Sequence, residues 1–282
     1  MLSTGFEGAA LVWAVFCASA ATLLQETPEL EFSAALFETL AVKISIVVPA
    51  FNEEKLIAIS LRHIQSASEA FRVLNWETEL IVCDNNSTDR TADLARAAGA
   101  QVVFEPVNQI ARSRNKGASA AHGEWLVFVD ADSQPSRELF AEVAQQIQDG
   151  QCLAGGCTVQ IDEPHFVGRL ATTLWNFISR TTRWAAGSFI FCRTDAFREV
   201  GGFNQELFAS EEIDLSKRLK KLAKTRGQRI RILHRHPILT SARKIHLYTR
   251  GEYLRFFLKV LLRPRQTLRL REACLTWYDG RR

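Results

Sequence analysis

Two aspartates one residue apart, Asp130 and Asp132, are the most chemically informative residues of the sequence. They directly follow an apolar run, residues 125–129, which predicts a buried strand. In an extended chain, residues at i and i+2 project to the same side, so we expect both carboxylates to point together from the end of this strand. Paired carboxylates suit a hard divalent cation that is also bound to phosphate oxygens. The pair therefore predicts a metal–phosphate site.

The chain from Lys43 onward alternates short apolar runs with segments of helical periodicity. This alternation is typical of βαβ units on a parallel sheet. In such sheets, ligands bind beyond the carboxyl ends of the strands. Polar clusters follow three of the apolar runs, so the sequence predicts that they meet at one edge of the sheet and form one site. These clusters are residues 49–53, 84–89 and 130–132.

The composition is that of a folded globular protein. A chain of 282 residues with 47% hydrophobic and 23% charged residues is long enough to bury a core as one domain. The net charge of +4 is too mild for a general nucleic-acid binder, so no nucleic-acid partner is expected. The six cysteines form no Cys-x-x-Cys pair, and the six histidines form no tight cluster, which argues against a zinc site. We expect reduced core cysteines in a cytoplasmic protein.

The two ends of the chain differ from its middle. Residues 1–42 contain no Lys or Arg, and within them residues 9–24 are apolar and uncharged but shorter than the ~20 residues of a spanning helix. We expect an N-terminal appendage, either an extra helix or a loosely ordered leader, with a membrane anchor as the alternative. Residues 241–282 interleave apolar residues with arginine, which predicts a basic amphipathic tail. Such a tail either lies at an anionic membrane surface or packs on the domain.

Four short motifs occur in order in the first half of the chain: residues 46–54 (IVVPAFNEE), 84–91 (DNNSTDRT), 111–117 (ARSRNKG) and 130–132 (DAD). Together with a later segment, residues 210–215 (SEEIDL), this set resembles family 2 glycosyltransferases with the GT-A fold. The resemblance implies a single α/β domain, residues 43–240, with a Rossmann-like, mostly parallel sheet flanked by helices and with helical appendages at both ends. Residues 43–135 would be the nucleotide-binding half and residues 136–240 the acceptor half.

The resemblance also implies where a nucleoside-diphosphate sugar would bind. The loop after the first strand would contact base and ribose, Asp84 would recognise the nucleotide, and Arg114 would bind the diphosphate through charge-assisted hydrogen bonds. A glycine at position 187 would let the backbone approach the sugar. From the residues alone, Asn52 is also expected to cap the next helix, and Asp84 suits an Asx turn. The residues implied in donor binding are Pro49, Asn52, Glu53, Asp84, Arg114, Asp130 and Gly187.

The resemblance further implies a metal-assisted, inverting displacement. Asp132 would ligate Mg²⁺ or Mn²⁺ at the diphosphate, while Asp130 would hold the ribose or share the metal. Glu212 stands where the family places its catalytic base, which is usually an aspartate. Glutamate keeps the carboxylate and lengthens the side chain by one methylene. Glu211 would contact hydroxyls of the acceptor or the donor.

The expected function is transfer of one sugar to a hydroxyl of a glycan, a lipid or another acceptor. The sequence has no Gln-x-x-Arg-Trp motif, which favours single transfer over polymer synthesis. A nucleotidyltransferase acting on a sugar phosphate is one alternative, but its glycine-rich basic loop is replaced here by acidic residues 50–54. A catalytically inactive nucleotide-sugar-binding module is the other. The basic tail adds peripheral contact with the inner face of a membrane as an open alternative for location.

Overall fold

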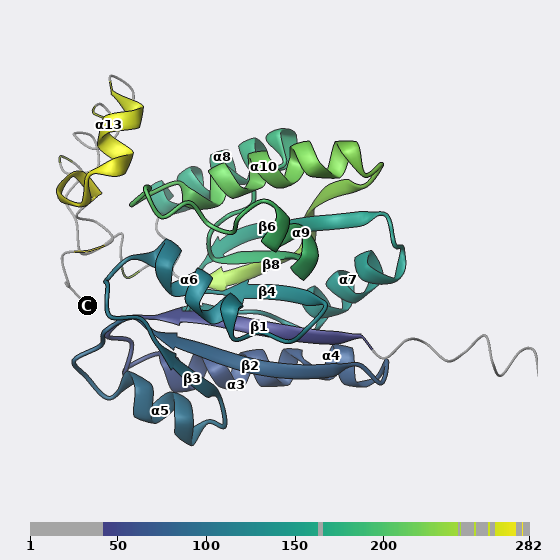
Figure 1. Cartoon of the computed structure of the whole chain (residues 1–282), viewed down its shortest axis with the longest axis horizontal. Helices are drawn as coiled ribbons and strands as arrows, with labels where there is room; N and C mark the ends of the chain where they lie inside the picture. The colour runs from purple at the N-terminus through teal and green to yellow at the C-terminus, as the bar shows by residue number, and fades with distance from the viewer. Residues whose placement is uncertain are drawn as a thin grey trace, which may run out of the picture. The chain divides into compact units, whose positions relative to one another are not determined.

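The computed structural model describes residues 42–162, 166–241, 243, 251, 259, 263–274 and 278 (Figure 1). The predicted N-terminal appendage, apart from Val42, and most of the predicted tail therefore lie outside the described residues. The strands are β1 (Lys43–Ala50), β2 (Glu77–Asp84), β3 (Gln101–Phe104), β4 (Trp125–Val129), β5 (Ser133–Gln134), β6 (Cys152–Ile161), β7 (Phe189–Arg193) and β8 (Arg229–Thr240). The helices are α3 (Ile57–Ala67), α4 (Glu69–Arg72), α5 (Thr91–Ala97), α6 (Ile110–Ser119), α7 (Arg137–Gln148), α8 (Phe166–Thr182), α9 (Thr194–Glu199), α10 (Glu211–Thr225), α13 (Pro264–Arg269) and the 3₁₀ helix η1 (Arg271–Cys274).

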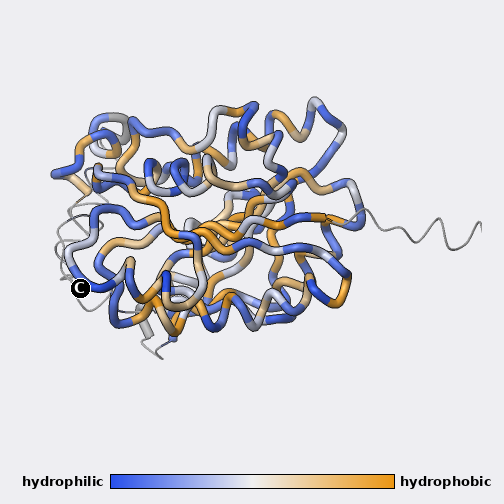
Figure 2. The backbone as a smooth tube through the Cα atoms, turned by 60° about the horizontal axis from the view of Figure 1, so that its bottom comes forward, coloured by the Kyte–Doolittle hydropathy of each residue, from blue (hydrophilic) through white to orange (hydrophobic). Residues whose placement is uncertain are grey.

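The described strands form one sheet in the order β3-β2-β1-β4-β7-β6-β8-β5. From β3 to β4 all neighbours are parallel, as the alternation of strands and helices predicts. β7 is antiparallel to β4 and to β6, whereas β6 and β8 are parallel and β5 is antiparallel to β8. The sheet as a whole is therefore mixed. The central strands are its most continuously hydrophobic part (Figure 2).

Helices cover both faces of the sheet. Successive side chains of a strand point to opposite faces, so the buried residues of β1 alternate between two hydrophobic clusters. Ile46 and Val48 pack with residues of α3, α4 and α7 on one face. Val47 packs with residues of α6, α9 and α10 on the other face. Both clusters meet at β1 and β4, whose carboxyl ends are thereby held in a rigid core. None of the described helices has the length and apolar character needed to cross a membrane.

The cysteines follow the sequence prediction wherever the structure describes them. All five in the described residues are buried and free of disulfide bonds. Burial raises the pKa of the Cys83 thiol to about 11 and that of Cys152 to about 12. Thiols with such pKa values are inert components of the core at neutral pH. Cys17 lies outside the described residues.

A glycine in β6 allows three strands to pack closely. A Cβ added at Gly155 would lie 2.3 Å from the carbonyl oxygen of Arg231 in β8 and 2.5 Å from the ring of Phe191 in β7. Real Cβ atoms do not approach other atoms this closely, so the sheet would have to shift. Glycine is therefore required here by the space between neighbouring strands.

We predict that Gly155→Ala lowers the free energy of unfolding by about 1–3 kcal/mol, because the added methyl group overpacks the core. Urea denaturation measures the change. Gly227→Asn is the matched control, since that position has a φ of +66° and open space around it, and asparagine tolerates this conformation. A Gly155→Ala protein as stable as the parent chain would contradict the prediction.

Candidate active site

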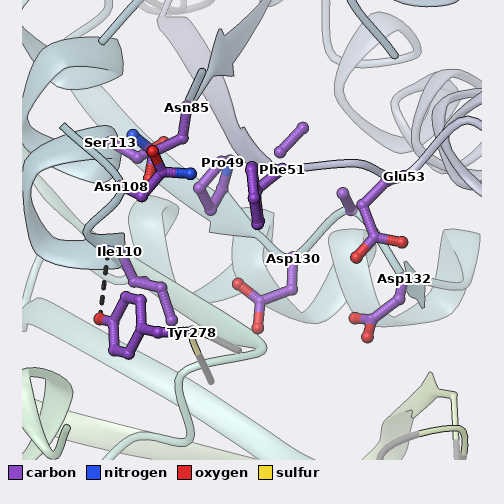
Figure 3. Close-up of a pocket in the computed structure, with 12 residues that line it drawn as sticks. Pro49, Phe51, Glu53, Asn85, Asn108, Ile110, Ser113, Asp130, Asp132 and Tyr278 are labelled. Atoms are coloured by element: carbon purple, nitrogen blue, oxygen red, sulfur yellow. Dashed lines mark hydrogen bonds between the residues drawn. The ribbon is translucent and has the colours of Figure 1, made fainter. Parts of the chain in front are cut away.

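A pocket lies at the carboxyl ends of β1, β2 and β4 (Figure 3). Residues that follow each of the three strands line it, so the prediction that the polar clusters meet at one sheet edge is confirmed. Four of the predicted site residues are among the lining residues: Pro49, Glu53, Asp130 and Asp132.

Asp130 and Asp132 reach the pocket from a turn and not from an extended segment. β4 ends at Val129, and the amide of Ser133 donates to the carbonyl of Asp130 at 3.0 Å, which closes a turn over residues 130–133. Both carboxylates line the same pocket (Figure 3). The extended geometry given as the reason for their juxtaposition was wrong, and that the two carboxylates point together stays a prediction. The metal-binding role of the pair remains a prediction.

The guanidinium of Arg114, on α6, joins this pocket to the start of α10. Nη2 donates to Asp130 Oδ1 at 2.9 Å and to the carbonyl oxygen of Gly187 at 2.8 Å. Nη1 donates to Glu211 Oε1 at 2.8 Å. Burial lowers the pKa of Arg114, but the attraction of the surrounding carboxylates outweighs it and raises the pKa above its usual range. Arg114 is therefore a permanent buried cation that holds two carboxylates.

In this geometry Arg114 contacts protein oxygens, and its contact with the donor phosphates stays a prediction. Its side chain is only 3% exposed, and both terminal nitrogens bind protein oxygens. The third nitrogen, Nε, is buried and has no hydrogen-bond partner among the described residues. The alternative of a solvated position on a surface helix is wrong, because Arg114 is buried. Sequence reasoning missed the contact with Glu211 because that residue lies 97 residues further along the chain.

Glu211 and Glu212 open α10 beside this cation. The preceding residue, Ser210, has a φ of 63°, and this left-handed residue turns the chain into the helix. A Cβ added at Gly187 would lie 3.1 Å from Arg114 Nη2 and 3.8 Å from Glu212 Cδ. The glycine thus permits the close approach of these two side chains. Its approach to a sugar stays a prediction.

Glu212 has a strongly perturbed carboxyl group. Burial and the neighbouring carboxylate of Glu211 raise its pKa, and Arg114 offsets part of this effect, so that the pKa is about 8. A carboxyl group with this pKa exchanges its proton near neutral pH, which suits general acid–base work. Perturbed titration of this kind is concentrated at functional sites.

Asn52 has a different structural role from the predicted helix cap. α3 has Leu56 as its N-cap residue and no side-chain cap. Asn52 instead has a φ of 52°, and its Oδ1 accepts a hydrogen bond from the amide of Thr88 at 2.8 Å. It therefore ties the loop after β1 to the loop after β2, at the edge where the pocket lies.

The end of β2 places Asn85 in the pocket, whereas the predicted residue Asp84 lies outside its lining. Asp84 is buried, and its Oδ1 accepts from the amide of Ser87 at 3.1 Å in an Asx turn. Asn85 Oδ1 accepts from the amide of Gln109 at 2.9 Å, and its Nδ2 donates to the carbonyl of Val107 at 2.6 Å. Asn85 thus fixes the loop before α6. Nucleotide recognition by Asp84 stays a prediction.

The segment after β8 returns to the pocket, which sequence reasoning did not predict. Arg243 Nη2 donates to both carboxylate oxygens of Glu53, at 2.8 and 2.9 Å. The amide of Ser241 donates to the carbonyl of Asp132 at 3.2 Å. Tyr278 also lines the pocket, and its hydroxyl accepts from the amide of Ile110 at 3.3 Å (Figure 3). The basic residues of the tail gave no signal for these particular contacts.

The comparison with known families decides the classification of the chain. The sequence model described as Glycosyl transferase family 2 matches residues 45–201, which is more than half of the chain. The chain belongs to glycosyl transferase family 2. The undecaprenyl-phosphate 4-deoxy-4-formamido-L-arabinose transferase of Pseudomonas fluorescens is 31% identical over 165 residues, which cover 56% of this chain and 47% of that protein. The chain spans less than two thirds of the length of the curated relatives that it matches.

Solved structures confirm the GT-A fold of this family 2 chain. The mannosyltransferase PcManGT of Pyrobaculum calidifontis, in complex with GDP-Man and Mn²⁺, has a TM-score of 0.58 at 19% identity and covers 86% of this chain and 66% of that one. TarS of S. aureus in complex with UDP-GlcNAc has a TM-score of 0.56 at 21% identity and covers 82% of this chain and 68% of that one. At these identities the likeness shows the fold alone.

The carboxylate oxygens that line this pocket fit a divalent cation whose remaining ligands come from a bound phosphate and water. Within the part of the chain that the structure describes, no group of three or more His, Cys, Asp or Glu side chains is arranged to hold a metal. Mg²⁺ is usually held by one or two carboxylates together with substrate phosphates and water. Asp130 and Asp132 supply such a pair at the pocket wall.

We predict that Arg114→Met lowers the free energy of unfolding by about 3–5 kcal/mol, because it leaves buried carboxylates without their cation. Urea denaturation at pH 7 measures the loss. Arg112→Met is the matched control on the same helix, since Arg112 also pairs with a glutamate, Glu105, but is 36% exposed. Glu105 is only 10% exposed, but the partly solvated Arg112 side chain leaves water able to reach the carboxylate, so the expected loss is smaller, at about 1 kcal/mol. Equal losses in the two variants would contradict the assigned role of Arg114.

Proposed function

We propose that this chain transfers a single sugar from a nucleoside-diphosphate sugar to an acceptor hydroxyl, with inversion. The observation that carries the proposal is the ion-pair bridge through Arg114. It links Asp130, on the nucleotide-binding side of the pocket, to Glu211 at the start of α10. The bridge thus joins a metal-binding candidate from the first half of the chain to the acceptor half, next to the candidate base Glu212.

The donor would occupy the pocket at the ends of β1, β2 and β4. Pro49 and Asn85 line it at the ends of β1 and β2, and Asp130 and Asp132 line it at the end of β4. Relatives in the fold comparison bind UDP-GlcNAc or GDP-Man, which supports a nucleoside-diphosphate sugar without choosing the base. Asn52 and Asp84 would support the donor site indirectly, because their side chains hydrogen-bond the backbone of the loop after β2.

A divalent cation, Mg²⁺ or Mn²⁺, would be held by Asp132 and Asp130. When bound, it offsets the negative charge that grows on the departing nucleoside diphosphate. The mannosyltransferase of similar fold is in complex with Mn²⁺, which supports this assignment. Arg114 fixes one oxygen of Asp130, so that carboxylate keeps its orientation with or without the donor.

Glu212 would act as the base. Its carboxylate takes the proton from the acceptor hydroxyl while the oxygen attacks the anomeric carbon, and the bond from that carbon to the diphosphate oxygen breaks. One displacement of this kind inverts the configuration at the anomeric carbon and requires only one base. A pKa of about 8 makes the group basic enough to accept the proton while still titrating near neutral pH. Glu211, held by Arg114, stays available only as a positioning group.

The acceptor is proposed at the level of a hydroxyl on a glycan, a lipid or another small molecule. The Pseudomonas relative is named for an undecaprenyl-phosphate acceptor, which keeps lipid-linked acceptors within the proposal. Family membership favours glycosyl transfer over the nucleotidyltransferase alternative. The two reactions differ in product, because a nucleotidyltransferase releases pyrophosphate and a glycosyltransferase releases a nucleoside diphosphate.

We predict that Asp132→Ala lowers Mn²⁺-dependent turnover of the donor sugar by about 100-fold or more, because the variant loses a ligand of the cation that stabilises the leaving group. Release of UDP or GDP from a panel of nucleotide sugars, with Mn²⁺ or with EDTA, measures turnover. Thermal shifts with UDP and GDP measure binding separately. Asp149→Ala, which removes an exposed aspartate remote from the pocket lining, is the control.

Three results of this experiment would count against the proposal. Pyrophosphate as the product would support a nucleotidyltransferase. Nucleotide-sugar binding with no turnover for any acceptor would support an inactive binding module. Unchanged turnover in Asp132→Ala would remove the metal site from the mechanism.

We predict a pH dependence of kcat/KM for the acceptor that depends on Glu212. Its folded-state pKa is raised to about 8, so the basic form is the minor species below pH 8 and grows as the pH rises. The rate should therefore rise tenfold per pH unit below about pH 8 and level off above it. Glu212→Gln should lose about 100-fold to 10,000-fold in rate and should also lose this limb of the profile.

The same pKa shift predicts the sign of the effect on stability. Since the folded state binds the proton of Glu212 more tightly than the unfolded state does, its contribution is present below about pH 4.5 and is lost as the pH rises through about 8. Glu212→Gln should weaken this loss of stability between the two pH values. A variant that keeps both the rate limb and the stability profile of the parent chain would exclude Glu212 as the base.

A further inference from the structure

Helix α8 exposes three large apolar side chains on one face. Leu170, Leu174 and Phe177 are 61%, 59% and 67% exposed. Their spacing of four and three residues places them in one row along the helix. Ser179, which is fully buried, lies on the opposite face, so the row points away from the sheet. Among the described residues, the fold therefore leaves this apolar row without a partner.

Cations lie along one side of this row. Arg169 and Arg180 are exposed and lie on the same side of α8, where they line a groove beside β6 and β8. α8 contains no acidic residue, and neither arginine has a carboxylate partner among the described residues. The groove also contains His234 and one acid, Asp162. The balance of charge along the row is therefore positive.

Helix α10 continues the positive surface at the C-terminal end of α8. Lys217 lies over the ring of Trp184 at 4.8 Å, and Lys220 Nζ donates to the carbonyl of Thr182 at 3.1 Å. Lys221 and Lys224 lie four residues after Lys217 and Lys220, respectively, so all four lysines share one exposed face of α10. Figure 1 shows α8 and α10 together on one side of the molecule. Cations thus lie beside the apolar row in the groove and at the C-terminal end of α8.

We propose that the α8 surface, formed by Leu170, Leu174, Phe177, Arg169 and Arg180, binds an anionic phospholipid bilayer. Helices that lie in a membrane interface combine exposed Leu and Phe with flanking Lys or Arg, and anionic headgroups attract those cations. A second copy of this chain is a poorer occupant, because it would bring its own cations against these. The inference goes beyond glycosyl transfer, and it is independent of the predicted contact through residues 241–282.

The test is co-sedimentation of the full chain with vesicles. Vesicles of phosphatidylcholine alone are compared with vesicles that also contain phosphatidylglycerol. We expect binding to the anionic vesicles, weakened by salt, and at least about a tenfold loss of partitioning in Leu174→Glu/Phe177→Glu. Ile59→Glu/Val73→Glu is the matched control, because it adds the same charge at exposed apolar residues of α3 and at the end of α4. This control should bind like the parent chain.

A second variant separates the two parts of the α8 surface. Arg169→Gln/Arg180→Gln should reduce binding to anionic vesicles without adding any charge to the apolar row. Unfolding midpoints by circular dichroism check that each variant remains folded. Vesicle binding equal to that of the parent chain in both α8 variants would overturn the proposal. So would a dimer in sedimentation velocity that dissociates in the Glu variant while vesicle binding is unchanged, since the occupant would then be a second copy.

Discussion

The buried guanidinium of Arg114 is the interaction on which the arrangement of the pocket depends. A permanent cation enclosed in protein must be surrounded by acceptors, because removing it from water without them is prohibitively costly. Here the acceptors come from three separate parts of the chain: the loop after β4, the segment before β7 and the start of α10. Satisfying one charge therefore fixes three backbone segments relative to one another. The pocket is shaped by that requirement.

The sheet fixes the positions of the loops that the Arg114 cation does not contact. β1 pairs in parallel with β2 and β4, so the loops after these strands leave the sheet at one edge. Alternating β1 residues pack into cores on both faces, which keeps this edge from moving. Asn52 and Asn85 then tie neighbouring loops to one another through backbone amides. Rigid strand ends and cross-linked loops together hold side chains to the accuracy that chemistry requires.

The sequence was a reliable guide to the strands, to their common edge and to the polar residues that follow them. These features depend on local periodicity, which residues 44–129 display clearly. It failed where partners are far apart in sequence. Nothing local reveals that Arg114 contacts Glu211 or that Arg243 contacts Glu53, 190 residues earlier. It also failed at Asn52 and at the turn after β4, because the local hydrogen bonds of a loop depend on the neighbouring loop.

The charges around Arg114 do not balance, and this imbalance explains the state of Glu212. One guanidinium faces the carboxyl groups of Asp130, Glu211 and Glu212. Asp130, Glu211 and the Gly187 carbonyl take its hydrogen bonds, so the third carboxyl group is left half-buried with only partial compensation. It therefore holds its proton to a higher pH than an exposed glutamate does. Glu212, which makes no hydrogen bond to the guanidinium among the bonds that Arg114 donates, is therefore the carboxyl group able to exchange a proton near neutral pH.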